Sequence, residues 1–323
     1  MRVSPPISGH QAEQYHRVGF LRRKPVNNQP LCWERDGCRW PNQQSSRFIA
    51  AGGIRWHVQV MGQGPVVLLL HGTGASSHSW RELAPDLAHN YTVVVPDLPG
   101  HGFTEAPVAT DMSLPGMANL LESLLLTLEL RPELAVGHSA GAAIAAKMCL
   151  NDAMAPNWLV SINGALLPLS GIPGWVYSPI ARMLASGGFW VKLLARSAAD
   201  RSAVERLVQR TGSVIGPEGV DLYAKLLRTT SHTAAALCMM AHWDLRSLQR
   251  QLQDLKPNLL LLVGENDLMV PPEQANRLAR LLPSTELRRM ADCGHLLHEE
   301  KPQQTAALIR QYGQYHQGSA AAV

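Results

Sequence analysis

Hydrophobic residues occur in short runs along most of the chain, and each run ends near a glycine, a proline or an aspartate. The clearest runs are residues 65–70, 134–137 and 257–263. A strand of a parallel sheet is covered on both faces, so its sequence is apolar throughout and does not alternate with polar residues. The pattern therefore predicts buried strands at these runs, and further strands at residues 54–60, 91–95, 159–162 and 286–290.

Segments with a helical spacing of apolar residues lie between and after these runs. They predict helices at residues 80–88, 114–130, 141–150, 272–282 and 303–313. Strands that alternate with helices form a mostly parallel sheet with right-handed crossovers and helices on its faces. We therefore predict an α/β fold with a mostly parallel central sheet flanked by helices.

The alternation of strands and helices stops after residue 167. Residues 168–246 are helix-like and amphipathic, for example over 180–196 and 203–210, and contain no convincing strand. We interpret 168–246 as a helical cap inserted into a core made of residues 32–167 and 247–316. Residues 1–31 show no periodic apolar pattern, and we expect them to form a disordered or non-native tail.

Composition and charge exclude several classes of protein. Hydrophobic residues make up 46% of the 323 residues, enough for a large core. The net charge of +4 comes from the first 31 residues, so we expect no nucleic-acid partner. The five cysteines are scattered and no cluster has metal-ligand spacing, so we expect neither metal nor cofactor. With no apolar segment suited to span a membrane, we expect a cytoplasmic protein, or one bound peripherally to a membrane.

The motif Gly137-His138-Ser139-Ala140-Gly141 joins a predicted strand to a predicted helix. A serine on such a sharp turn has a strained backbone, and the turn needs small residues two positions before and after it. The amide that follows the serine lies at a helix N-terminus, where partial positive charge favours an oxyanion. The motif therefore predicts Ser139 as a nucleophile, with the Ala140 N–H as an oxyanion donor and Gly137 and Gly141 as structural support.

The loop His71-Gly72-Thr73-Gly74 follows the predicted strand at residues 65–70. A second oxyanion donor is needed from a loop in this place, and we predict the Thr73 N–H in that role, supported by Gly72. We expect His71 to be structural. The glycine spacing does not match a phosphate-binding loop.

A catalytic acid and a histidine follow the serine in the order that this chemistry requires. Asp267 begins the loop after the strand at 257–263, and His295 follows the last predicted strand. The histidine would accept the serine proton, and the carboxylate would orient the imidazole. Glu265 as the acid and His298 as the base remain open as alternatives.

Aromatic and methionine side chains of the cap are candidates for lining an apolar substrate pocket. Packing between the cap helices would explain the same residues. With the histidine beside the predicted nucleophile, the candidates are His138, Trp175, Trp190, Met239 and Trp243.

The chain from residue 48 to 313 resembles the α/β-hydrolase superfamily through the successive segments HGTG, DLPGHG, GHSAG, GEND and DCGH. This resemblance implies the α/β-hydrolase fold with an inserted cap. The serine at position 139 argues against the haloalkane dehalogenase and epoxide hydrolase branches, which place an aspartate there.

A narrower resemblance lies nearer the N-terminus. Trp33-Glu-Arg-Asp36, Trp40-Pro-Asn42, Ser46-Arg-Phe48 and the segment 51–57 are similar to the magnesium chelatase accessory family of bacteriochlorophyll biosynthesis. The resemblance implies a part in magnesium insertion into protoporphyrin IX, with a small apolar or tetrapyrrole-like ligand and chelatase subunits as partners. Members of that family usually start near the Trp33 segment, so residues 1–31 depart from the pattern.

Three functions remain open from the sequence. The first is a serine hydrolase of the pigment pathway, acting on an ester, thioester or lactone. The second is a general carboxylesterase or C–C hydrolase outside pigment synthesis. The third is a non-catalytic porphyrin-binding accessory of the chelatase.

Overall fold

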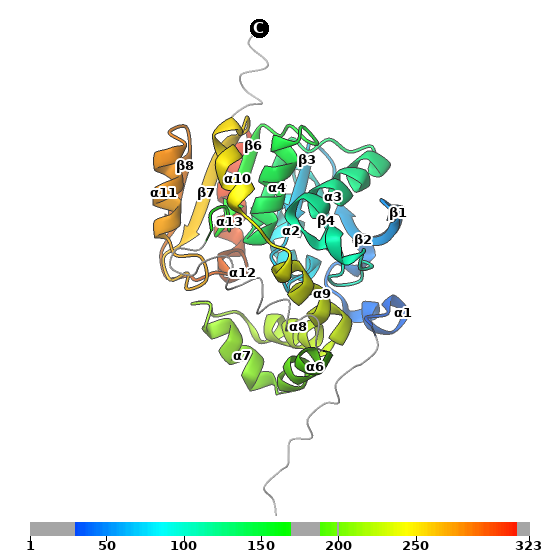
Figure 1. Ribbon diagram of the computed structural model, residues 1–323. Helices are drawn as coiled ribbons and strands as arrows, with labels where there is room; N and C mark the ends of the chain where they lie inside the picture. Colours follow the sequence, from blue (N-terminus) through cyan, green and yellow to red (C-terminus); the bar gives the residue numbers. More distant parts are fainter. Residues whose placement is uncertain (1–29, 169–187, 199, 315–323) are drawn as a thin grey trace, which may run out of the picture.

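A computed structural model describes residues 30–168, 188–198 and 200–314. Its centre is one eight-stranded sheet in the order β1-β2-β4-β3-β5-β6-β7-β8 (Figure 1). Pairing is antiparallel from β1 to β2 and from β2 to β4, and parallel across the rest. The strands are β1 (Ser46–Ala51), β2 (Ile54–Met61), β3 (Val66–Leu70), β4 (Thr92–Pro96), β5 (Leu134–His138), β6 (Trp158–Ile162), β7 (Asn258–Gly264) and β8 (Glu286–Met290).

The seven predicted strands correspond to β2–β8, with ends that differ by a residue or so. The apolar runs form strands that are buried on both faces, as expected. Every residue of β5 and β6, for example, is buried. Strand β1 was not predicted. It is an edge strand with mixed burial, so its sequence lacks both a continuous apolar run and a clean alternation.

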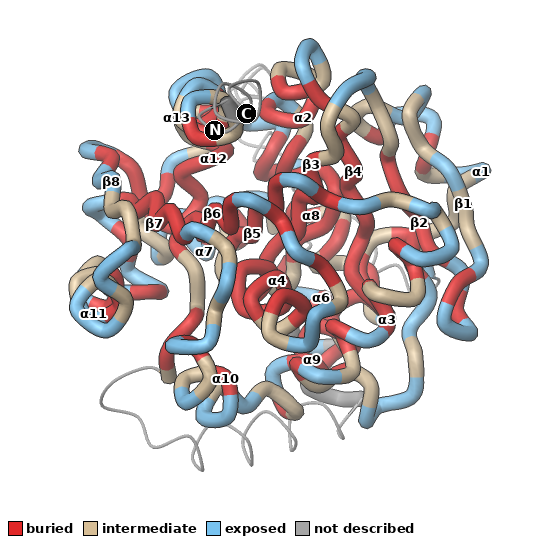
Figure 2. The backbone as a smooth tube through the Cα atoms, turned by 90° about the horizontal axis from the view of Figure 1, so that it is seen from above, coloured by how far each residue is buried: buried red, intermediate tan, exposed pale blue. Residues whose placement is uncertain are grey.

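Helices cover both faces of the sheet (Figure 2). Alternate residues of β3 point to opposite faces, with Leu68 and Leu70 in one apolar cluster and Val67 and Leu69 in the other. The first cluster is completed by α3 (Leu114–Leu128), α4 (Ala140–Leu150), α10 (Arg246–Gln251) and α11 (Glu273–Leu281). The second is completed by α2 (Leu83–Leu87), α12 (Leu297–Glu300) and α13 (Pro302–Gln314).

The helix predicted at residues 80–88 is shorter than expected. It begins at Leu83, because the chain from Ser77 to Trp80 forms a separate 3₁₀ turn. The helix predicted at 114–130 ends at Leu128, since Glu129 adopts a left-handed conformation with φ of 55°. The helices predicted at 141–150, 272–282 and 303–313 correspond to α4, α11 and α13 within a residue or so, whereas α10 and α12 were not predicted.

A helical insertion lies between β6 and β7, as α6 (Gly188–Ser197), α7 (Arg201–Gln209), α8 (Pro217–Arg228) and α9 (Thr230–Ala241). These helices lie together at one end of the sheet (Figure 1). Only the part of the predicted segment 180–196 from Gly188 onward lies within the described residues. The limits of the cap at 168 and 246 stay a proposal.

The segment before β1 packs between the core and the insertion. It contains the short helix α1 (Trp33–Asp36), and Lys225 of α8 donates to Asp36 O at 3.0 Å. Trp40 is buried in one apolar cluster with Phe103 of the core and Leu222 of α8. Within the part of the chain that the structure describes, no helix has the length and apolar character needed to cross a bilayer.

Candidate active site

Ser139 lies on the turn between β5 and α4, at the carboxyl end of the sheet. Its backbone has φ of 52° and ψ of −116°, a strained conformation for a residue with a side chain. A Cβ atom at Gly137 would overlap Ala142, and one at Gly141 would overlap Leu70 O. Both glycines are therefore needed for the turn to form. The turn has the geometry of a nucleophile elbow, while the catalytic role of Ser139 stays a prediction.

Asp267 and His295 form a buried pair. Asp267 follows β7 and His295 follows β8, and the histidine Nδ1 lies 2.8 Å from the aspartate Oδ2. The other carboxylate oxygen accepts hydrogen bonds from the backbone N–H groups of Met269 and Val270. Because the carboxylate is an acceptor, Nδ1 donates, and the imidazole is fixed in one orientation.

Two side chains tie the His295 loop to the strands beside the elbow. His138 Nε2 donates to His295 O at 2.9 Å, and the two rings lie 4.7 Å apart. Asn163, just after β6, donates to the same carbonyl and to Gly294 O, both at 2.9 Å. The histidine beside Ser139 therefore contacts the loop that carries His295. Asn163 was not predicted as a site residue, since its one signal in the sequence is its place at the end of a predicted strand.

The geometry favours Asp267 and His295 over the two open alternatives. Glu265 is exposed, whereas Asp267 is buried and bonded to the histidine. His298 lies between Trp80 and His138, with each ring centroid 4.5 Å away. Burial holds the pKa of His298 well below its ordinary value, so the ring is neutral in the fold.

The loop after β3 approaches the elbow closely. A Cβ atom at Gly72 would lie 2.9 Å from His138 Nδ1 and 3.1 Å from Ser139 Cβ, which explains the glycine at this position. His71 Nε2 accepts a hydrogen bond from the backbone N–H of Leu98 at 2.8 Å. This hydrogen bond supports the structural role expected for His71. Thr73 lies on the same loop, next to Gly72, which approaches Ser139.

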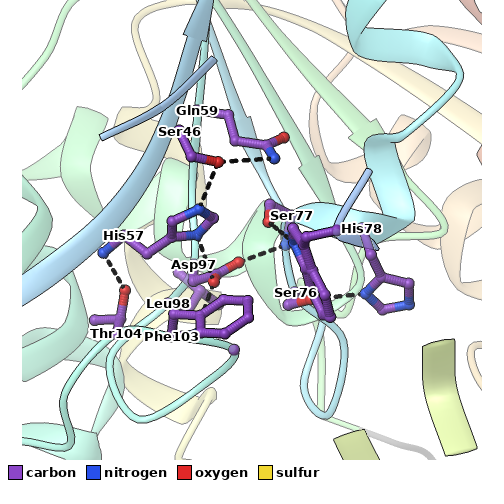
Figure 3. A network of polar contacts seen from close by, with 12 residues as sticks. Ser46, His57, Gln59, Ser76, Ser77, His78, Asp97, Leu98, Phe103 and Thr104 are labelled. Atoms are coloured by element: carbon purple, nitrogen blue, oxygen red, sulfur yellow. Dashed lines mark hydrogen bonds and ion pairs between the residues drawn. The ribbon is translucent and has the colours of Figure 1, made fainter. Parts of the chain in front are cut away.

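Asp97, in the loop after β4, organises a second polar network (Figure 3). One of its carboxylate oxygens accepts from Ser77 N at 2.6 Å, and the other accepts from Phe103 N at 2.9 Å and from His57 Nδ1 at 2.8 Å. Burial alone would raise the pKa of Asp97, but His57 and the backbone donors hold it well below its ordinary value. His57 in turn contacts Ser46 Oγ at 2.9 Å, so the network joins β1 and β2 to the loop after β3.

The candidate pocket residues lie in different places. Met239 is buried on α9 and its sulfur accepts a hydrogen bond from Thr73 Oγ1 at 3.5 Å. Trp243 packs against the larger core cluster. Trp175 and the side chain of Trp190 lie outside the described residues. A substrate pocket formed by these residues and His138 stays a prediction.

Among the residues that the structure describes, no three His, Cys, Asp or Glu side chains are grouped so as to hold a metal ion. The described cysteines are all free thiols.

Comparison with known proteins agrees with this architecture. Residues 65–302 match the alpha/beta hydrolase fold family. The chain is 40% identical over 262 residues to the magnesium-chelatase 30 kDa subunit of Rhodobacter capsulatus, covering 80% of this chain and 91% of that protein. It is 25% identical to the 2-hydroxy-6-oxo-2,4-heptadienoate hydrolase of Pseudomonas putida, covering 84% of this chain and 97% of that enzyme.

Solved structures show the same fold. A putative lipase from Acinetobacter baumannii superposes with a TM-score of 0.71 at 22% identity, covering 92% of this chain and all of that one. An α/β-hydrolase fold protein from Burkholderia ambifaria gives 0.69 at 24% identity, covering 82% and 97%. The chain therefore belongs to the α/β-hydrolase fold family, and within that family it is a relative of the magnesium-chelatase 30 kDa subunit.

Proposed function

We propose that this chain is a serine hydrolase that acts in bacteriochlorophyll biosynthesis, at or near the insertion of magnesium into protoporphyrin IX. The observation that carries the chemistry is the strained turn at Ser139, whose neighbour His138 contacts the loop that carries the buried Asp267–His295 pair. The 40% identity to the magnesium-chelatase subunit supports the pathway. Chelatase subunits are then the expected partners, and a small apolar or tetrapyrrole-like molecule the expected ligand, in the cytoplasm or at a membrane surface.

The proposed reaction is acyl transfer from an ester, thioester or lactone. Ser139 Oγ attacks the carbonyl carbon while His295 Nε2 takes the serine proton, and Asp267 stabilises the imidazolium that forms. The oxyanion of the tetrahedral intermediate accepts hydrogen bonds from the backbone N–H groups of Thr73 and Ala140. As the intermediate collapses, His295 returns the proton to the leaving group. A water then releases the acyl group by the same steps.

Two other functions have some support. The Pseudomonas putida relative is a hydrolase by name, which favours a general esterase or C–C hydrolase outside pigment synthesis. The Rhodobacter capsulatus relative is a magnesium-chelatase subunit by name, which favours an accessory protein of the chelatase.

Covalent labelling tests the nucleophile. A fluorophosphonate probe should label wild-type protein at Ser139, and Ser139→Ala should abolish the label. Ser123→Ala is the matched control, because the Ser123 hydroxyl donates to Asn119 O within α3, away from the site, and labelling should be unchanged. Absence of label in folded wild-type protein would overturn the serine hydrolase.

Pigment intermediates in a deletion strain separate the three functions. Rescue of the strain by wild type and not by Ser139→Ala supports the proposed hydrolase. Rescue by both versions identifies the accessory protein, which absorbance titration with protoporphyrin IX would then detect as a shifted Soret band. Unchanged pigment levels in the deletion strain identify the general hydrolase.

A further inference from the structure

Helix α9 contacts the loop after β3 at two consecutive residues. His232 Nε2 lies 3.1 Å from Gly74 O, and Thr73 Oγ1 donates to Met239 Sδ at 3.5 Å. His232 and Met239 are seven residues apart, about two helical turns, so they lie on one face of the helix. Both side chains are buried. The insertion therefore contacts the residue expected to supply an oxyanion donor, and its neighbour.

The hydrogen bonds of His232 fix its tautomer. Gly102 N lies 3.1 Å from His232 Nδ1, and an amide N–H can only donate, so Nδ1 is the acceptor. Nε2 therefore carries the proton and donates to Gly74 O. Burial lowers the pKa of His232 to about 4, which agrees with a neutral ring. One imidazole thus joins α9 to two core loops, as an acceptor toward one and a donor toward the other.

The rest of the core holds the loop at its two ends. Leu98 N donates to His71 Nε2, and Ser77 N donates to Asp97 Oδ1. Between these anchors the chain turns at Gly74, which has φ of +79°, and a Cβ atom there would meet no other atom within 4 Å. The positive φ at this turn therefore favours glycine, and the turn is closed by the backbone N–H of Ala75, which donates to Gly72 O at 3.2 Å. The contacts with α9 add restraints at Thr73 and Gly74, in the middle of the loop.

We infer that His232 is a positioning residue, which couples the insertion to the oxyanion hole by holding the loop that carries the Thr73 N–H. This inference rests on the proposed function. Oxyanion donors act only when they lie about 3 Å from the developing charge, and loss of one costs about 10²–10³-fold in kcat. Release of the loop, which displaces the donor without removing it, should cost about 10–100-fold.

The coupling is tested first without reference to activity. Hydrogen exchange of the full chain should show faster exchange in residues 71–77 of His232→Ala than in wild type. His232→Gln, whose amide keeps one donor and one acceptor, should restore part of the protection. Thr233→Val is the matched control, because it removes a partly buried hydrogen bond to Leu227 O within the insertion, and residues 71–77 should be unaffected. Unchanged exchange in His232→Ala would overturn the coupling.

Hydrolysis of p-nitrophenyl acetate then tests the consequence. His232→Ala should lower kcat about 10–100-fold with KM changed less than threefold, His232→Gln should recover part of kcat, and Thr233→Val should match wild type. A wild-type kcat in His232→Ala, or a loss that lies in KM, would overturn the inference. If His232→Ala does not fold, kcat and KM are compared with wild type in His232→Gln and Met239→Leu, for which we expect smaller losses of kcat.

The two proposals fail in different ways. If wild-type protein hydrolyses no ester and is not labelled by fluorophosphonate, the serine hydrolase is overturned. Hydrogen exchange in residues 71–77 then tests by itself whether His232 holds the loop. Active wild-type protein with unchanged exchange and kcat in the His232 variants overturns only the positioning role.

Discussion

Arg81 and Glu299 form a buried ion pair, with Nη1 2.5 Å from Oε2. The second oxygen of Glu299 accepts a hydrogen bond from the Tyr223 hydroxyl at 2.7 Å. Arg81 follows the 3₁₀ turn after β3, Glu299 lies four residues after His295, and Tyr223 belongs to α8. The pair therefore joins the two loops that carry the candidate site, and Tyr223 adds the helical insertion.

Glu299→Gln should destabilise the fold by about 3 kcal/mol, because it leaves the buried Arg81 guanidinium with only the half-exposed Glu82 carboxylate, 3.7 Å away, as a charged partner. Tyr223→Phe should cost about 1 kcal/mol, the usual value of one buried hydrogen bond. Urea unfolding followed by circular dichroism measures both. Asp152→Asn is the control, since the Asp152–Lys256 pair is 73% exposed on both sides and should contribute less than about 1 kcal/mol. Equal losses of unfolding free energy in Glu299→Gln and Asp152→Asn would contradict the larger contribution expected for the buried Arg81–Glu299 pair.

Asp267→Asn should lower kcat for ester hydrolysis about 10³–10⁴-fold with little change in stability, because the amide no longer fixes the imidazole tautomer. Glu265→Gln should keep wild-type activity, since that side chain is exposed and does not contact His295. Stopped-flow or steady-state assays with p-nitrophenyl acetate make the comparison. A larger loss of kcat in Glu265→Gln than in Asp267→Asn would identify Glu265 as the catalytic acid.

Asp97→Asn should destabilise the protein by about 3 kcal/mol and also slow fluorophosphonate labelling of Ser139. The stability loss follows because both carboxylate oxygens of Asp97 accept hydrogen bonds from buried donors, and an amide can accept at only one of the two positions. The slower labelling follows from the weakened anchor at Ser77, which ends the loop that carries Thr73. Asp254→Asn, at an exposed position, should change neither quantity. Labelling at the wild-type rate in folded Asp97→Asn would show that the Asp97 network does not affect the reactivity of Ser139.

Stability should fall as the pH is lowered from 7 to 5. The unfolded chain protonates His232 near its ordinary pKa of about 6.5, whereas the folded chain does so only near 4, so acid favours unfolding across that interval. His232 faces His71, which lowers its pKa further, and Asp97, which raises it. This group alone should contribute about 2 kcal/mol of loss by pH 5.

The depressed pKa of Asp97 has its effect at lower pH. Its contribution to stability is present above the unfolded pKa of about 4 and is lost as the pH falls below it toward the folded value. Urea midpoints at pH 7, 6 and 5 test the histidine effect. His232→Gln should reduce the pH dependence without abolishing it, because burial also lowers the pKa of His138 and His298. A pH-independent midpoint would be incompatible with a buried neutral His232.

Strands β3 to β7 were predictable because nearly all of their residues are buried, and their sequences are largely apolar for that reason. The elbow at Ser139 was predictable because the sharp turn requires small residues two positions before and after the serine, and the motif has glycine at both positions. The contacts of Asn163, His57 and His232 were not, since each joins segments 40 or more residues apart and leaves no periodic trace. Strand β1 was missed because its residues form neither a continuous apolar run nor a clean alternation.

The two antiparallel strands at one end of the sheet have a practical consequence for protein production. The family match begins at residue 65, after both β1 and β2. A fragment cut there would expose the hydrogen-bonding edge of β4 and leave Asp97 without its imidazole partner. We therefore expect a stable fragment to be larger than residues 65–302. It should also begin before Trp33, so that helix α1 and the hydrogen bond from Lys225 of α8 to Asp36 O are retained.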